Sequence, residues 1–227
     1  MSEPEEMHDY SGPFRPEFQL EDLSKQALVT LCREFMIAAH LLDRAIMPAI
    51  LQRFGAQAME ELAIEEWRGA SPVYTERIRK AMKIEGNDVA AIFKSLQMDP
   101  GFPHQYMDVK YEVVDEKKGF FWLDYCGALA DVEPWGEARV VSMCHHIEDP
   151  TFDATMQAVN PKAKCRPVHR PPRDPKDRKP VCHWEVVIDD AAEPAEEAPI
   201  TKITRLSTAA TFEFSPVRKR ASKGKGE

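Results

Sequence analysis

The chain has 227 residues, of which 43% are hydrophobic and 30% are charged, and its formal net charge at pH 7 is −8. This composition is typical of a globular protein, and no apolar run reaches the ~20 residues that a membrane-spanning helix needs. The negative charge argues against nucleic acid as a partner of the whole chain, because non-specific binding depends on neutralising phosphates.

The first 20 residues are predicted to form an extended arm, since Pro4, Pro13 and Pro16 interrupt any regular pattern. The chain starts with acidic residues, where a secretory signal would be basic and then apolar. Five cysteines are an odd number, and none forms a Cys-x-x-Cys pair, which argues against a disulfide framework. We therefore expect a cytoplasmic protein whose cysteines are thiols.

A long helix is predicted to begin near Ser24, where apolar residues start to recur at helical spacing. Pro48 is expected to kink or restart this helix. Its main apolar stripe consists of Leu28, Leu31, Phe35, Ala38, Leu42 and Ile46.

Three further helices are predicted in the N-terminal half. The second covers residues 56–67, and the third starts at Ser71 with Pro72 in its first turn, where the missing N–H has no cost. A short fourth helix begins at Asn87 and ends at Asp99, which opens an Asp-Pro-Gly turn.

After Pro103 apolar residues recur at every second position, which predicts strands. Helices are expected between the second and third of these strands, at about 134–147 and 149–160. The four expected strands are residues 107–113, 120–126, 162–168 and 182–188. The fold class predicted is therefore α+β, with a helical N-terminal half packed on a small antiparallel sheet with further helices.

The expected domain organisation has three parts. Residues 1–20 form the N-terminal arm, and residues 21–188 form a single α+β domain, helical over 21–99 and sheet-containing over 104–188. Residues 189–227 are expected to be a flexible charged tail.

Four of the seven histidines and three of the five cysteines lie between Cys144 and His183. Imidazoles and carboxylates together can act as general acids and bases, or can hold one divalent zinc, iron or manganese ion. Both interpretations stay open, as does a packing role for the cysteines and a helix-capping role for Asp149. The predicted catalytic residues are His145, His146, Asp149, His169, His183 and Glu185, and all but Glu185 are also candidate metal ligands.

A basic loop follows, over residues 162–180. Guanidinium groups form paired hydrogen bonds with carboxylates, so the loop is expected to hold the polar end of a substrate. His40 lies on the side of the first helix away from its apolar stripe and is a further candidate for a ligand pocket. The predicted substrate-binding residues are Arg166, Arg170, Arg173, His40 and Trp122.

The order of several short motifs resembles a known family. A Leu-x-x-Glu-Glu-Trp helix (62–67) precedes a hairpin that ends in Cys126, a helix that contains Cys144, and a Cys-x-Trp strand that starts at Cys182. Over about residues 24–188, this order resembles the L-2-amino-thiazoline-4-carboxylic acid hydrolase-like proteins and, more distantly, the vinyl-reductase-type ligand-binding domains. The resemblance implies a small-molecule pocket between helices and sheet, and hydrolysis of a small heterocyclic carboxylate. The chain departs from the family where His145 and His146 follow Cys144.

The function predicted is that of a hydrolase or lyase acting on a small carboxylated or aromatic compound through the His/Asp/Cys cluster, with or without a metal. The alternative is a vinyl-reductase-type binding or sensor module without catalysis. A small molecule is the expected partner, a homodimer is left open, and neither nucleic acid nor a membrane is expected. The enzymatic interpretation requires the histidines to meet in one water-accessible cavity.

Overall fold

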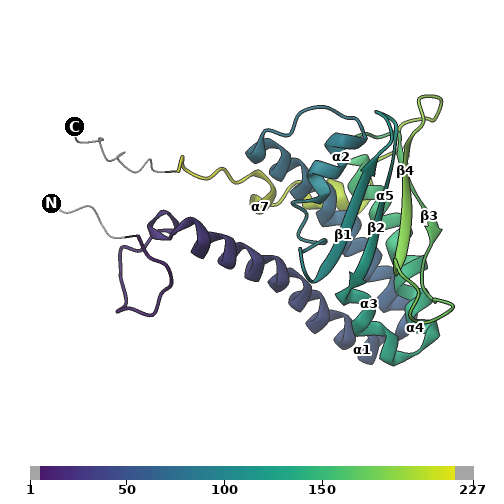
Figure 1. Ribbon diagram of the computed structural model, residues 1–227, viewed down its shortest axis with the longest axis horizontal. Coiled ribbons are helices and arrows are strands. Elements are labelled where there is room, and N and C mark those ends of the chain that lie inside the picture. The colour runs from purple at the N-terminus through teal and green to yellow at the C-terminus, as the bar shows by residue number, and fades with distance from the viewer. Residues whose placement is uncertain (1–5, 218–227) are drawn as a thin grey trace.

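The structure is a computed structural model that describes residues 6–217. One face of a four-stranded antiparallel sheet is covered by helices (Figure 1), which confirms the predicted α+β class. The strands lie in the order β1-β2-β4-β3, and every neighbouring pair is antiparallel. Their bounds are Met107–Val113 (β1), Lys118–Cys126 (β2), Ala163–His169 (β3) and Cys182–Ile188 (β4).

Helix α1 is a single run of 58 residues, Lys25–Met82, in place of the three helices expected. The hydroxyl of Ser24 caps its start by accepting a hydrogen bond from the backbone N–H of Ala27. The run is interrupted at Gly55, whose φ of 89° is a conformation that glycine adopts at little cost. The helix continues past the start predicted at Ser71, so Pro72 lies inside it. Proline has no backbone N–H, so the helical hydrogen bond to the carbonyl oxygen of Arg68 cannot form.

The first part of α1 projects from the body of the protein (Figure 1). Its apolar stripe does not face the core, since Phe35 is 59% exposed and Leu42 is 71% exposed. The buried side is the opposite one, which carries His40, Asp43 and Met47. The periodicity identified the apolar face, but it gave no information on which face meets the rest of the chain.

The remaining helices are short and pack on the inner face of the sheet or beside it. Asp88, and not Asn87, caps α2 by accepting a hydrogen bond from the N–H of Ala91 at 2.7 Å. Residues 142–147 wind as a wider π-helical turn, so that α4 runs through it into α5. The bounds are Val89–Leu96 (α2), Gly127–Val132 (α3), Glu137–Val141 (α4) and Glu148–Gln157 (α5), with single turns at Leu20–Asp22 and Glu133–Trp135.

The main core lies between the inner face of the sheet and these helices. Phe121 on β2 and Trp184 on β4 are both 0% exposed, and their stacked rings are 6.2 Å apart between centroids. Phe152 of α5 packs edge-on against both rings. Side chains of a strand alternate between its two faces, so Phe120 and His183 point to the outer face of the sheet.

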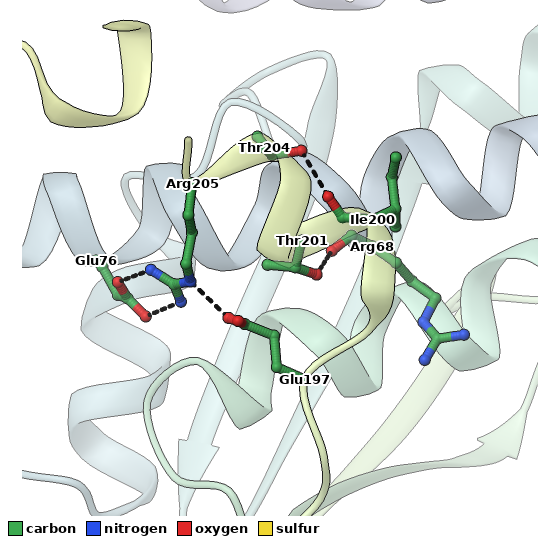
Figure 2. Close-up of polar contacts among 7 residues, drawn as sticks. All are labelled: Arg68, Glu76, Glu197, Ile200, Thr201, Thr204 and Arg205. Atoms are coloured by element: carbon green, nitrogen blue, oxygen red, sulfur yellow. Dashed lines mark hydrogen bonds and ion pairs between the residues drawn. The ribbon is translucent and has the colours of Figure 1, made fainter. Parts of the chain in front are cut away.

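The chain after β4 packs against α1, although it was expected to form a flexible tail. Helix α6 (Pro199–Thr204) lies beside α1, and α7 (Thr208–Thr211) follows it. Figure 2 shows Arg205 donating two hydrogen bonds to Glu76 of α1, at 2.7 and 2.6 Å, and one to Glu197 at 2.6 Å. The end of the predicted tail, residues 218–227, lies outside the described residues.

Thr201 supplies the hydrogen bond that Pro72 removes from α1. Its hydroxyl is buried and donates to the carbonyl oxygen of Arg68 at 2.7 Å (Figure 2). We expect the change Thr201→Val to lower the free energy of unfolding by about 1–3 kcal/mol, because a buried carbonyl loses its donor. In a Pro72→Ala background the helix regains an N–H at position 72, so the same change should cost clearly less.

Urea unfolding of the unmodified protein, Thr201→Val, Pro72→Ala and the double variant measures the cost of Thr201→Val in the two backgrounds. Thr201→Ser keeps the hydroxyl that donates to Arg68 and is the control in which this hydrogen bond is retained. Equal costs of Thr201→Val in both backgrounds would show that the hydroxyl does not replace the missing N–H.

Among residues 6–217, no helix is both long enough and apolar enough to cross a membrane. The five cysteines are all free thiols, as expected, and four of them are buried.

Candidate functional site

A cavity of about 380 Å³ lies between α1, the inner face of the sheet and the segment from α3 to α5. Most of its wall is apolar, with contributions from Met47, Phe102, Leu123, Leu129, Met143, Ile147, Phe152 and Val181. A few polar side chains interrupt this wall, which is the composition typical of small-molecule sites.

His40 is the most unusual polar residue of this wall. It is 5% exposed, and neither ring nitrogen makes a hydrogen bond of good geometry with a described residue, although the backbone of Pro100 and Gly101 lies near enough to act on its pKa. The ring packs against Tyr106 and Trp67, with centroids 5.0 and 6.1 Å away. Burial, and then the nearby charge of Arg44, lower the pKa of His40, so the imidazole is neutral at pH 7 and offers one donor and one acceptor. A buried polar group without a partner is costly, which marks His40 as a contact for a ligand.

Two arginines line the cavity, and they differ in their partners. Arg44 forms an ion pair with Asp43, and its Nε donates to Asp131 at 2.8 Å. Tyr106 donates its hydroxyl to the same Asp131 oxygen at 2.7 Å. Arg139 forms no direct ion pair within residues 6–217, although the charges of Asp43 and Glu60 act on it, and its guanidinium donates one hydrogen bond, to the hydroxyl of Ser142 at 3.3 Å. Arg139 is therefore the lining cation that remains available to an anionic group.

Three thiols and one carboxyl lie in another part of the wall. They belong to Cys126, Cys144, Cys182 and Glu148, which come from β2, the π-helical turn, β4 and α5. Burial raises the pKa of Cys126 to about 12 and raises that of Cys144 further. These thiols are protonated at neutral pH, and a protonated thiol is a poor nucleophile.

Glu148 holds a proton at neutral pH. Burial raises its pKa from an ordinary value of 4.5 to about 8, although the charge of Arg170 acts in the opposite direction. Its carboxyl accepts no hydrogen bond from any described residue. A protonated carboxyl beside a cavity can donate a hydrogen bond or a proton to a bound molecule.

The raised pKa makes stability depend on pH. Below about pH 4.5 the carboxyl of Glu148 is protonated in both the folded and the unfolded chain, and its contribution to stability is fully present. As the pH rises toward about 8, the unfolded chain releases the proton and the folded chain retains it, so stability is lost. Glu148→Gln cannot ionise, and we expect its free energy of unfolding to exceed that of the unmodified protein increasingly from about pH 5 to about pH 8.

Urea unfolding at several pH values measures this difference. Glu185→Gln, on the outer face of the sheet, is the control. If Glu148→Gln and the unmodified protein differ in free energy of unfolding by the same amount at every pH, the raised pKa of Glu148 is contradicted.

The histidines predicted from the sequence do not meet in this cavity. His145 makes a hydrogen bond of 2.7 Å to the carbonyl oxygen of Pro171, and His146 contacts Glu60 at 3.0 Å on the surface. His169 and His183 lie together on the outer face of the sheet, with ring centroids 6.1 Å apart. The expectation of one shared cavity was therefore wrong, because β4 points His183 away from the helices.

The other predicted catalytic and aromatic residues lie elsewhere as well. Asp149 is in the first turn of α5, where it pairs with Arg170 and does not cap the helix. Glu185 forms an ion pair with Lys118, and Trp122 packs edge-on against His183 on the outer face. None of these side chains lines the cavity.

The three arginines predicted to bind a substrate are also outside the cavity. Arg170 is paired with Asp149 and lies 5.8 Å from the ring of Trp184, and Arg173 is paired with Glu133 at 2.5 Å. Arg166 is exposed on β3. Of the predicted substrate-binding residues, His40 is the one that the structure places in the wall.

Within residues 6–217, no group of three histidine, cysteine, aspartate or glutamate side chains is arranged to hold a metal ion. The divalent metal expected from the sequence stays a prediction.

Sequence reasoning missed Arg139, Glu148 and Cys126 as cavity residues. One signal was available for Glu148, which follows Cys144 by four positions and so shares a helix face with it. Arg139 carried no signal, since a single arginine on a predicted helix is usually a surface residue.

Comparison of the chain with protein-family models, with curated proteins and with solved structures gives no match. The resemblance to the L-2-amino-thiazoline-4-carboxylic acid hydrolase-like proteins therefore stays a prediction. The fold and the cavity define an α+β protein with a cavity of the size of a small ligand.

Proposed function

We propose that this protein binds a small organic molecule, with an apolar body and a polar end, in the cavity between α1 and the sheet. The observation that carries the proposal is the mostly apolar cavity of about 380 Å³ whose wall contains the buried imidazole of His40, which makes no well-formed hydrogen bond with a described residue. Sites for small molecules have volumes of roughly 300–1,000 Å³, apolar walls and a few polar groups. The cavity has each of these properties.

The polar end of the ligand is proposed to be a carboxylate or a hydroxyl group. Arg139 forms no direct ion pair in the described chain, and a guanidinium binds a carboxylate through paired hydrogen bonds. The neutral ring of His40 can donate one hydrogen bond and accept one, as a hydroxyl group requires. In this proposal Arg139 and His40 replace the arginines of the basic loop as anchors.

A panel of aromatic and aliphatic carboxylates, each with its matching alcohol, tests the proposal by titration calorimetry. We expect at least one compound of about 10–14 non-hydrogen atoms, such as 2-naphthoate, to bind with a Kd of about 100 µM or tighter. Arg139→Leu should weaken binding of the carboxylate more than binding of the alcohol. Absence of binding across the whole panel would count against the proposal.

Catalysis is the second candidate function, and one observation favours it. The carboxyl of Glu148 holds its proton near neutral pH beside the cavity, as a general acid in a hydrolase or lyase must. If the protein is an enzyme, Glu148 is the proposed general acid in place of the histidine cluster. Turnover of a bound compound that is lost in Glu148→Gln, with binding retained, would support catalysis over simple binding.

The location and partners belong to the same proposal. A cytoplasmic location is supported by the free thiols, because disulfides are rare in that compartment. Neither nucleic acid nor a membrane is part of the proposal. A homodimer is supported by exposed apolar side chains on the first part of α1.

A further inference from the structure

The first part of α1 carries a row of exposed apolar side chains on its outer side. The row repeats every seven residues and consists of Leu28, Leu31, Phe35, Ala38, Leu42, Ala45 and Ala49. Phe35 is 59% exposed and Leu42 is 71% exposed, Ala38 and Ala45 are exposed as well, and the other three members are half-buried. Apolar residues at alternating spacings of three and four form the contact line of paired helices, since this period keeps one line facing the partner.

This row, called the α1 seam below, is the side of the helix opposite to the cavity. His40, Asp43 and Met47 line the cavity from the other side of the same turns. From position 35 to position 52 the charged residues are Asp43 and Arg44, and both interact on the cavity side. The α1 seam is therefore uncharged over five turns. Burying it against a partner would not remove any charged group from water.

The order of large and small side chains makes the α1 seam complementary to itself. When the helix is reversed about position 40, Leu31 falls opposite Ala49, Phe35 opposite Ala45, and Leu42 opposite Ala38. Each large side chain then meets an alanine, which lets the two helices interdigitate. We propose that two copies of this chain pair along the α1 seam, antiparallel and related by a two-fold axis near residue 40.

Geometry and area are consistent with this pairing. An interface of this kind uses the same patch of both copies, as most homodimers do. The body of each copy lies on the cavity side of its own α1, so the two bodies lie on opposite sides of the helix pair. Pairing over about three heptads buries on the order of 1,200 Å² in total, which reaches the lower limit of specific stable interfaces.

The test is the mass of the full chain in solution, measured by light scattering during gel filtration and by sedimentation equilibrium over a range of concentrations. We expect a dimer. Leu42→Glu and, separately, Phe35→Glu should weaken dimerisation at least about 30-fold, because each places a charge at the centre of the interface. Both side chains are exposed within one copy, so the helix content measured by circular dichroism should not change.

Leu206→Glu is the matched control, since Leu206 is 86% exposed but lies outside the α1 seam. It should leave the dimer intact. A monomeric unmodified protein at about 100 µM would overturn the proposal. A dimer that both Leu42→Glu and Phe35→Glu leave unweakened would overturn it equally.

Discussion

Phe121→Ala is expected to lower the free energy of unfolding by about 3–5 kcal/mol. Phe121 is 0% exposed, and its ring packs against those of Trp184, Phe152 and Phe102. Removing the ring therefore forfeits its burial and leaves a hole that its rigid aromatic neighbours cannot close. Urea unfolding followed by circular dichroism measures the change.

Phe120→Ala is the matched control, because Phe120 is the preceding residue of the same strand and points to the outer face. Its ring contacts His183 and the amino group of Lys118, and both contacts are partly exposed. We expect a loss of about 1 kcal/mol or less. Similar costs for both changes would mean that the core does not lie on the side of the sheet described here.

His40→Leu is expected to change stability and binding in opposite directions. Leucine keeps the apolar contacts with Tyr106 and Trp67 and removes two buried nitrogens without partners. The free energy of unfolding of the ligand-free protein should rise by about 1 kcal/mol or more. Binding of a ligand with a polar end should weaken about 10–30-fold, since such a ligand loses a buried hydrogen bond.

This combination separates a binding role from a packing role. A histidine that only packs would lose stability when replaced and would not change ligand affinity. His183→Leu is the control on the outer face of the sheet, where we expect no effect on binding. A destabilised His40→Leu protein with unchanged affinity would contradict the role proposed for His40.

The sequence predicted the four strands of the second half of the chain, but not helices α3, α6 and α7. The alternation along β1 and β4 identified both strands within a residue, because one side of each strand faces the core and the other faces solvent. The fold class followed from these strands and the helical first half. Periodicity was sufficient here because it is a local property of the chain.

The location of the cavity could not be derived in this way. Period-two alternation shows that His183 and Trp184 lie on opposite faces, but it does not show which face the helices cover. For α1, periodicity identified the more apolar side, but the structure buries the side with His40 and Asp43. In both cases tertiary contacts decide which face is buried.

The clustering of histidines along the sequence was also misleading. His145 and His146 are consecutive on a helical turn and point to different partners, a backbone carbonyl and Glu60. His40, distant in sequence from the cluster, is the histidine that reaches the cavity. Proximity in sequence is a weak guide to proximity in space when the segments belong to different layers.

The most direct test of the binding cavity is a nuclear magnetic resonance titration of protein labelled with ¹⁵N in its histidine rings. A carboxylate from the panel that binds by calorimetry is added, and the ring signals are assigned with His40→Leu and His183→Leu. We expect the ring nitrogens of His40 to shift as the ligand binds, while those of His169 and His183 stay unchanged. Shifts at His169 and His183 with none at His40 would place the ligand on the outer face of the sheet and contradict the proposed site.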